Sequence, residues 1–227
     1  MEKSVVEKIF DGVYKAYDRF LNFATFNKIN DWQNTLIKNT PNGKHILDIG
    51  TGTGEIVKKL YEKMGDSAYI YGMDLSFNML KKAKEKTNKN NVLFIKADAL
   101  KLPFKKNSLD NIYFSLVFRH LPANEITNQI KETLKENGYV SILEIAKPNS
   151  NITYNLILIF ADKIFRPIGR IIFSKEEWDY FIESITNSMT KKQMIDFFQE
   201  RDFSLHFYES RFFGLIHLAV FRKNPEV

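Results

Sequence analysis

The sequence predicts an α/β fold built on a doubly wound, mostly parallel seven-stranded sheet. Three observations support this prediction. Short apolar segments alternate with helical ones from residue 45 to residue 145, a glycine-rich turn at 50–54 follows the first of them, and Asp74 follows the second. Strands that alternate with helices form parallel β-α-β units. Because ligands of open parallel sheets bind where the strands end, we expect a site at the carboxyl edge of the sheet.

The elements follow from hydrophobic periodicity and from turn residues. Residues 2–38 predict two helices, and Pro41-Asn42-Gly43 separates them from the first strand. The expected strands are 45–49, 68–73, 92–96, 110–115, 139–145, 203–209 and 213–222. The expected helices after the first strand are 53–63, 76–86, 123–134, 175–185 and 190–199. Asn137-Gly138 is the expected turn into the fifth strand, and Arg211-Phe212 alone separates the last two strands, which predicts an antiparallel hairpin at the sheet edge.

The 227 residues are expected to form one domain, 1–227, with an N-terminal helical cap at 1–40 and an inserted helical lid at 149–200. Within the lid, the segment 152–173 carries apolar residues at helical spacing. One interpretation is a core or dimer face, which would make the chain a homodimer. The other is an apolar wall for a polyprenyl tail, with Lys163, Arg166 and Arg170 at lipid headgroups.

Composition excludes several classes of site and partner. The chain has no cysteine, and its four histidines show no His-Glu-x-x-His spacing, so we expect no disulfide and no metal. It contains no apolar run of the ~18 residues that span a membrane and no secretory signal. We expect a cytoplasmic protein, with peripheral contact at the inner membrane face as an extension. The net charge of +6 is interpreted mainly as scattered lysines on helix faces, such as Lys81, Lys82, Lys84 and Lys86, and no nucleic-acid partner is expected.

The glycine-rich turn predicts a site for an adenosine-containing cofactor. A dinucleotide fingerprint, G-x-G-x-x-G, would need glycine at position 55, where this chain has Glu55. An acid at a helix start disfavours a phosphate there. S-adenosylmethionine, which has no phosphate, fits better. The candidate cofactor-binding residues in this segment are Asp48, Gly50, Thr51, Gly52, Thr53 and Gly54.

Further candidate cofactor residues follow the other strands. Asp74 is expected to accept hydrogen bonds from both ribose hydroxyls, and Asp98, next to Ala99, from the adenine amino group. Ser115 ends the fourth strand. Leu75 and Met79 either flank the adenine or belong to the core of the next helix.

These motifs, in this order, resemble the class I S-adenosylmethionine-dependent methyltransferases, and more narrowly the ubiquinone/menaquinone biosynthesis C-methyltransferases. The resemblance runs over nearly the whole chain. Its motifs are Phe10-Asp11-Gly12-Val13, Tyr17-Asp18, Trp32, Leu102-Pro103-Phe104, Ser115-Leu116-Val117-Phe118-Arg119, Glu144-Ile145-Ala146-Lys147-Pro148, Ile168-Gly169, Trp178-Asp179-Tyr180-Phe181 and Gly214-Leu215-Ile216-His217. His120 stands where the family usually has an asparagine.

The resemblance implies methyl transfer from S-adenosylmethionine to a ring carbon of a prenylated quinol precursor, with S-adenosylhomocysteine as the product. It implies that Thr53, Asp74, Asp98, Ala99 and Ser115 contact the cofactor. It also places Arg119 in the substrate loop and Tyr17 on a helix that closes over the site.

Methylation of an aromatic carbon needs an electron-rich ring, so a ring hydroxyl must lose or share its proton. Arg119 is a candidate to stabilise the resulting phenolate. His120 is a candidate general base, because an unperturbed histidine pKa of ~6.5 lies near working pH. The base is His120, a water held by Arg119, or neither; Tyr17 is either a lid residue or a core residue.

Two alternative functions would use the same cofactor site. One is a methyltransferase that acts on a small soluble metabolite or another lipid. The other is a binding module that holds the cofactor without turnover.

Overall fold

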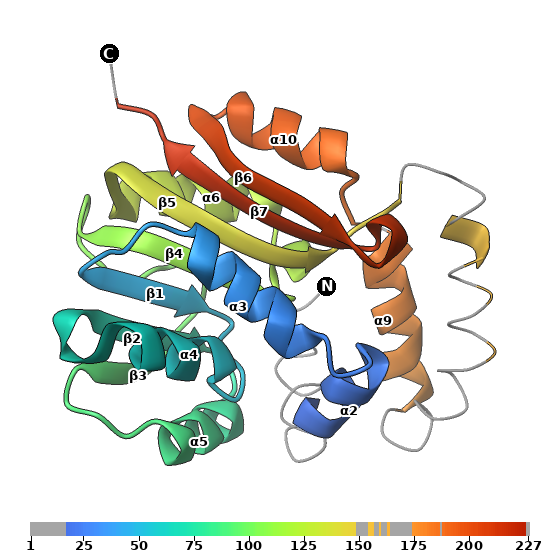
Figure 1. Cartoon of the computed structure of the whole chain (residues 1–227), viewed down its shortest axis with the longest axis horizontal. Coiled ribbons are helices and arrows are strands. Elements are labelled where there is room, and N and C mark those ends of the chain that lie inside the picture. The colour runs from blue at the N-terminus through green and yellow to red at the C-terminus, as the bar shows by residue number, and fades with distance from the viewer. Residues whose placement is uncertain are drawn as a thin grey trace.

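The computed structural model describes residues 17–148, 154–156, 159, 163, 174–186 and 188–225. Its centre is a seven-stranded sheet in the order β3-β2-β1-β4-β5-β7-β6 (Figure 1). All neighbouring strands are parallel except β7, which runs antiparallel to both β5 and β6. The predicted fold class is therefore confirmed. The strands are β1 (His45–Ile49), β2 (Tyr69–Asp74), β3 (Val92–Lys96), β4 (Leu109–Ser115), β5 (Leu134–Ile145), β6 (Phe203–Arg211) and β7 (Ile216–Lys223).

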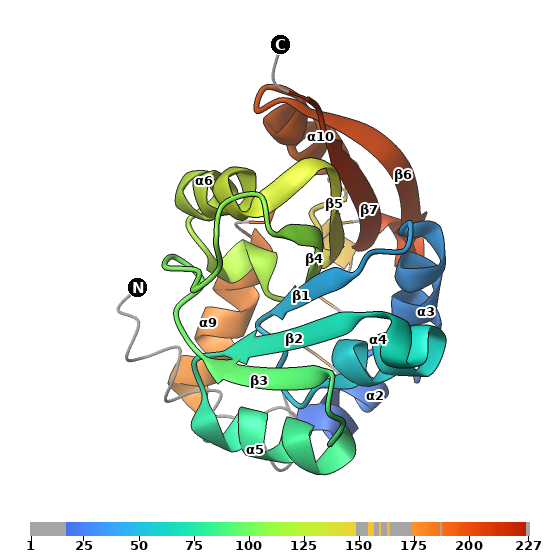
Figure 2. The same ribbon diagram turned by 90° about the vertical axis from the view of Figure 1, so that its left-hand side faces the viewer.

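Helices cover both faces of this sheet (Figure 2). Side chains alternate between the faces along each strand. In β7, Leu218 and Val220 belong to one core cluster, and Ala219 and Phe221 belong to the other. The first cluster packs under α3 (Ile29–Asn39) and α4 (Glu55–Met64), and the second under α6 (Ala123–Thr133) and α10 (Lys191–Gln199). The other long helices are α2 (Tyr17–Ala24), α5 (Phe77–Lys86) and α9 (Lys175–Thr186).

The fifth strand begins earlier than the sequence predicts. β5 starts at Leu134, which pairs with Leu109, and the register then jumps so that Asn111 pairs with Tyr139. The intervening residues form an irregularity in which Asn137 adopts a left-handed φ of +63°. The predicted turn at Asn137-Gly138 is thus a bulge inside the strand rather than its start.

The C-terminal hairpin is present, but its connection is longer than the two residues expected. β6 ends at Arg211 and β7 starts at Ile216, with the 3-10 turn η4 (Phe212–Gly214) and Leu215 between them. Phe212 and Phe213 both have positive φ values, of +52° and +56°. Bulky residues adopt this conformation rarely, so the sequence offers no signal that the turn predicted at Arg211-Phe212 continues through Phe213.

The range predicted as a lid divides into two parts. α10 packs Met194 and Phe198 into the core against Phe203 and Phe221, so it covers the sheet rather than a crevice. α9 instead lies with α2 beyond the carboxyl end of β1 (Figure 1). Most of 152–173, on which the homodimer interpretation rests, lies outside the described residues, as do residues 1–16 of the cap. None of the helices in the described parts of the chain is long and apolar enough to cross a membrane.

Candidate active site

The glycine-rich loop joins β1 to α4 and is fixed by three hydrogen bonds that its backbone N–H groups donate. The Thr51 N–H donates to the Met73 carbonyl at 2.9 Å, and the Gly54 N–H donates to the Thr51 carbonyl at 2.9 Å. The Gly52 N–H donates to Asp74 Oδ2 at 2.8 Å. Gly54 has a φ of +81°, and a Cβ on it would lie 2.8 Å from the Ala83 Cβ, so only glycine fits this close approach.

Asp74 stands at the carboxyl end of β2, where the sequence placed the ribose acid. Its second oxygen, Oδ1, accepts the Ser76 N–H at 2.9 Å. Ser76 in turn caps α5 by accepting the Met79 N–H at 3.1 Å. Two backbone donors therefore set the orientation of the carboxylate between the glycine loop and the start of α5.

The next strand brings the predicted adenine acid beside Asp74. The Ala97 N–H donates to the Asp74 carbonyl at 3.2 Å, which ties the two strand ends together. Asp98 follows directly, and its Oδ1 accepts the Leu100 N–H at 3.1 Å. Ala99 is buried, and so is Met79, which is only 1% exposed and sits in the core, whereas Leu75 is half-buried. Of the two candidates to flank an adenine, the geometry favours Leu75.

Asp48 lies under the glycine loop and is almost completely buried. Its Oδ2 accepts the Thr51 hydroxyl at 2.6 Å, whereas Oδ1 has no hydrogen-bond partner. The pKa of Asp48 is raised to about 7; burial is the main cause, the hydrogen bond from the Thr51 hydroxyl opposes it, and the nearby charge of Asp74 adds to it. Loss of hydration disfavours the ionised carboxyl at this depth.

Ser115 ends β4, and α3 reaches it from the N-terminal cap. The Gln33 side-chain amide donates to Ser115 Oγ at 3.3 Å, while the buried Gln33 Oε1 has no partner. Sequence patterns assign Gln33 no role, because it lies on a helix whose apolar stripe is the only visible signal.

Arg119 belongs to a buried ion pair. It follows Ser115 in the 3-10 turn η2 (Phe118–His120), and its guanidinium contacts the Glu144 carboxylate. The two side chains are 6% and 3% exposed. The same guanidinium donates to the Leu116 carbonyl at 2.9 Å and to Ser184 Oγ of α9 at 3.2 Å. These contacts of the Arg119 side chain link η2 to β5 and to α9.

The pKa of His120 differs from the value that the sequence alone suggests. Burial, together with the charge of Arg119, lowers the pKa of His120 to about 2. The expectation that its pKa lies near working pH is therefore wrong, because the ring has lost hydration and faces a cation. The imidazole is neutral at physiological pH and holds a proton too weakly for an ordinary general base. The side chain of Tyr17 lies outside the described residues.

The chemistry of these side chains fits S-adenosylmethionine. A Cβ built on Gly52 would meet no atom within 4 Å, so the tip of the loop faces open space beside Asp74. Asp74 accepts the Gly52 amide at the edge of this space, Asp98 follows the end of the neighbouring strand, and α4 begins with Glu55. Carboxylates suit ribose hydroxyls and an adenine amino group, and they oppose phosphates.

Comparisons with known proteins identify the family of the chain and relate its fold to solved structures. The sequence model of the ubiE/COQ5 methyltransferase family matches residues 1–223. The demethylmenaquinone methyltransferase of Staphylococcus aureus strain MRSA252 is 29% identical over 206 residues, which is 88% of this chain and 86% of the relative. A SAM-dependent methyltransferase from Aquifex aeolicus superposes with a TM-score of 0.63 at 17% identity, covering 90% of this chain and 96% of that one. A putative methyltransferase solved with the Haloferax volcanii activator Trm112 superposes with a TM-score of 0.67 at 13% identity, covering 95% and 99%.

The chain belongs to the ubiE/COQ5 methyltransferase family and is an S-adenosylmethionine-dependent methyltransferase with a Rossmann-like fold.

Asp48→Asn tests the buried carboxyl while keeping an oxygen that accepts the Thr51 hydroxyl. The folded-state pKa of about 7 exceeds the ordinary value of 3.8, so this group contributes its full stability below pH 4 and loses it as pH rises toward 7. At about 1.36 kcal/mol per pH unit, the whole shift corresponds to about 4 kcal/mol. We expect urea unfolding at about pH 8 to favour the variant and the difference to shrink at about pH 4. A difference independent of pH would contradict this account.

Glu144→Gln tests the ion pair with Arg119. Removing one partner leaves a buried cation uncompensated, so we expect a loss of about 3 kcal/mol in the free energy of unfolding. Glu62→Gln is the control, because Glu62 pairs with Lys58 at 3.8 Å while 61% exposed. It should change stability by less than about 1 kcal/mol. Urea denaturation measures the free energy of unfolding of both variants. If both change it by the same small amount, the buried ion pair does not stabilise the contact of η2 with β5.

Proposed function

We propose that this chain transfers a methyl group from S-adenosylmethionine to a ring carbon of a prenylated quinol precursor of the menaquinone or ubiquinone type. The observation that carries the proposal is the family match over residues 1–223, together with relatives named demethylmenaquinone methyltransferase. The match includes the glycine loop, which serves the cofactor, and the η2 segment, which we assign to the acceptor.

We propose that different residues of the site bind different parts of the cofactor. Asp74 holds the ribose hydroxyls, because two backbone donors already orient its carboxylate. Asp98 and Ala99 hold the adenine, and Thr53 and Ser115 contact the remainder of the cofactor. The cofactor supplies a methyl group on a cationic sulfur, and the site contributes mainly alignment, which can lower a barrier by ~7–11 kcal/mol.

The acceptor side is assigned to η2 and α9. Neutral His120 suits a hydrogen bond with the acceptor ring hydroxyl, and its low pKa argues against its holding the proton at neutral pH. The contacts of Arg119 with Glu144, Leu116 and Ser184 argue for a positioning role instead of direct contact with a phenolate. Deprotonation by solvent is the path that these two observations favour.

The reaction is tested by incubating the protein with labelled S-adenosylmethionine and demethylated naphthoquinols or benzoquinols, kept reduced, with and without a prenyl tail. We expect label in the tailed quinol and none with Asp74→Ala, whose ribose acceptor is gone. Calorimetry of cofactor binding is run in parallel. If the cofactor binds and no quinol is labelled, the quinol proposal is wrong, and soluble metabolites become the acceptors to screen.

We also propose that the protein contacts the inner face of the membrane through an aromatic patch formed by Phe23, Phe26, Phe212 and Phe213. These side chains are 46%, 52%, 38% and 84% exposed. The rings of Phe26 and Phe212 stack with centroids 6.0 Å apart, which joins the turn after α2 to the tip of the β6–β7 hairpin. Lys28 and Arg211 flank the patch along the chain and match an anionic headgroup layer.

The backbone supports this interpretation of the patch. Phe26, Phe212 and Phe213 all have left-handed φ values, between +50° and +56°. Each such residue costs of order 1 kcal/mol, and the rings gain little burial in return. A prenylated quinol resides in the bilayer, so the enzyme must reach the membrane surface to bind it. Contact of the exposed rings with lipid would serve that purpose.

Vesicle co-sedimentation with phosphatidylglycerol and phosphatidylethanolamine tests the patch. Phe213→Ser should reduce binding by about tenfold, because withdrawing a Phe ring from water is worth about 1.5–3 kcal/mol. Phe77→Ser is the matched control, since Phe77 is 63% exposed on α5, outside the patch. Equal binding by both variants and the unchanged protein would overturn the membrane proposal without affecting the methyl-transfer proposal.

A further inference from the structure

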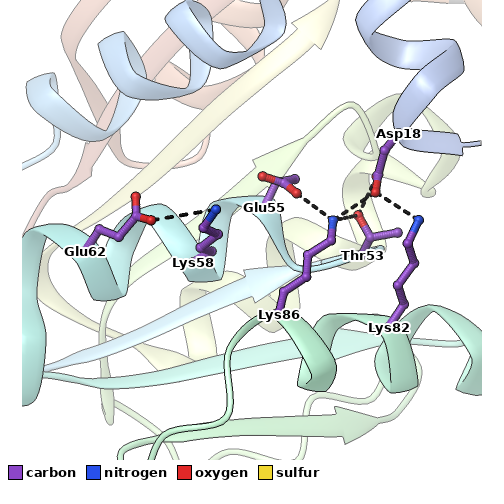
Figure 3. A network of polar contacts seen from close by, with 7 residues as sticks. All are labelled: Asp18, Thr53, Glu55, Lys58, Glu62, Lys82 and Lys86. Atoms are coloured by element: carbon purple, nitrogen blue, oxygen red, sulfur yellow. Dashed lines mark hydrogen bonds and ion pairs between the residues drawn. The ribbon is translucent and has the colours of Figure 1, made fainter.

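Five polar side chains form a cluster where α2, the glycine loop and α5 meet (Figure 3). We call it the Asp18 cluster; it consists of Asp18, Thr53, Glu55, Lys82 and Lys86. Asp18 Oδ1 accepts the Thr53 hydroxyl at 2.6 Å. Asp18 Oδ2 accepts from both lysines, each at 2.9 Å. Lys86 also donates to Thr53 Oγ1 at 2.9 Å and to Glu55 Oε1 at 2.5 Å.

The cluster differs from an ordinary surface ion pair in burial and in the number of charged groups that it connects. The side chains of Asp18, Lys82 and Lys86 are 25%, 26% and 22% exposed, and two carboxylates face two ammonium groups. By contrast, Lys58 and Glu62 on α4 lie 3.8 Å apart and are 47% and 61% exposed (Figure 3). Exposed pairs of the second kind contribute little, whereas partly desolvated networks contribute more.

The protonation of Asp18 is settled by the same contacts. Burial alone would raise the pKa of Asp18, but the hydrogen bonds from Thr53, Lys86 and Lys82 outweigh it and hold the pKa below its ordinary value. The carboxylate is therefore charged at neutral pH.

The numbers of hydrogen-bond donors and acceptors show that Asp18 is the residue through which α2 contacts the glycine loop. A threonine hydroxyl has one proton to donate, and Thr53 donates it to Asp18. An ammonium group has three donors, and Lys86 has three acceptors, of which two are Asp18 and Thr53. The direction of the Thr53 hydroxyl is thus set by a residue of the N-terminal cap, 35 positions away in sequence.

We propose that Asp18 is a positioning residue that couples the docking of α2 to the arrangement of the glycine loop, so that the cap completes the cofactor site. The inference rests on the cofactor role of Thr53 in the proposed function. It does not depend on the identity of the methyl acceptor. Lys86 acts with Asp18 as one unit, and Lys82 adds a second cation to the same carboxylate.

The test is the affinity for S-adenosylmethionine, measured by calorimetry without any acceptor at a temperature where each variant is folded. Asp18→Asn keeps the size of the side chain and removes its charge, and Lys86→Met keeps the length and removes the ammonium. We expect each variant to weaken binding about tenfold, since hydrogen bonds to charged groups are the stronger class. Because the two residues act together, the double variant should also weaken binding about tenfold, not a hundredfold.

Two further readouts separate positioning from simple stabilisation. Hydrogen exchange at the Gly52 amide should be faster in Asp18→Asn, because the loop loses its fixed neighbour, and the KM for the cofactor should rise more than kcat falls. Lys58→Met is the matched control and should leave affinity, exchange and kcat unchanged. An unchanged cofactor affinity in Asp18→Asn, or an additive double variant, would overturn the proposal. A failed quinol assay with intact binding would overturn only the proposed acceptor.

Discussion

The hydrogen bond from the Gly52 amide to Asp74 is the contact on which the rest of the site depends. It joins the loop after β1 to the end of β2, and the Thr51 amide reinforces it by donating to the Met73 carbonyl. With the loop fixed in this way, Asp74 is oriented before any ligand arrives. Asp98 is drawn to the same place through the Ala97 amide. A site of this kind is preorganised by backbone geometry, so its precision does not rely on flexible side chains.

Buried ionisable groups are the second feature on which the site depends, and they occur there in two forms. Asp48 is buried with one oxygen unsatisfied, which shifts its pKa toward neutrality. Arg119 and Glu144 are buried as a pair, and the pair holds η2 against β5 and α9. Both arrangements remove charged or ionisable groups from water, which carries a desolvation cost that apolar side chains do not have. Proteins tolerate such arrangements mainly where function needs them, which is consistent with their position at the carboxyl edge of the sheet.

The sequence predicts the sheet well because strand periodicity and turn residues are local signals. The cofactor-side positions 50–54, 74 and 98 follow from the same signals, since parallel strands bring their ends together. The remaining features depend on contacts between distant residues. Gln33 meets Ser115 across 82 positions, and Lys86 meets Asp18 across 68. Periodicity alone places Lys82 and Lys86 on a solvated face, and it assigns His120 an ordinary pKa. Both interpretations fail because packing against another segment changes the surroundings of the side chain.

Two segments outside the sheet, the N-terminal cap and α9, contact the residues at its carboxyl edge. Proteins with 13% and 17% identity share the fold, so the sheet and its loop do not determine which molecule is methylated. The N-terminal cap contacts the site twice, through Asp18 at the glycine loop and through Gln33 at the end of β4. On the other side, Ser184 of α9 contacts Arg119. The cap therefore holds the glycine loop and the end of β4, and α9 holds η2, which the proposed function assigns to the acceptor. Under that proposal, a change of acceptor specificity that arises in the cap is expected to alter cofactor affinity as well, because the cap carries Asp18.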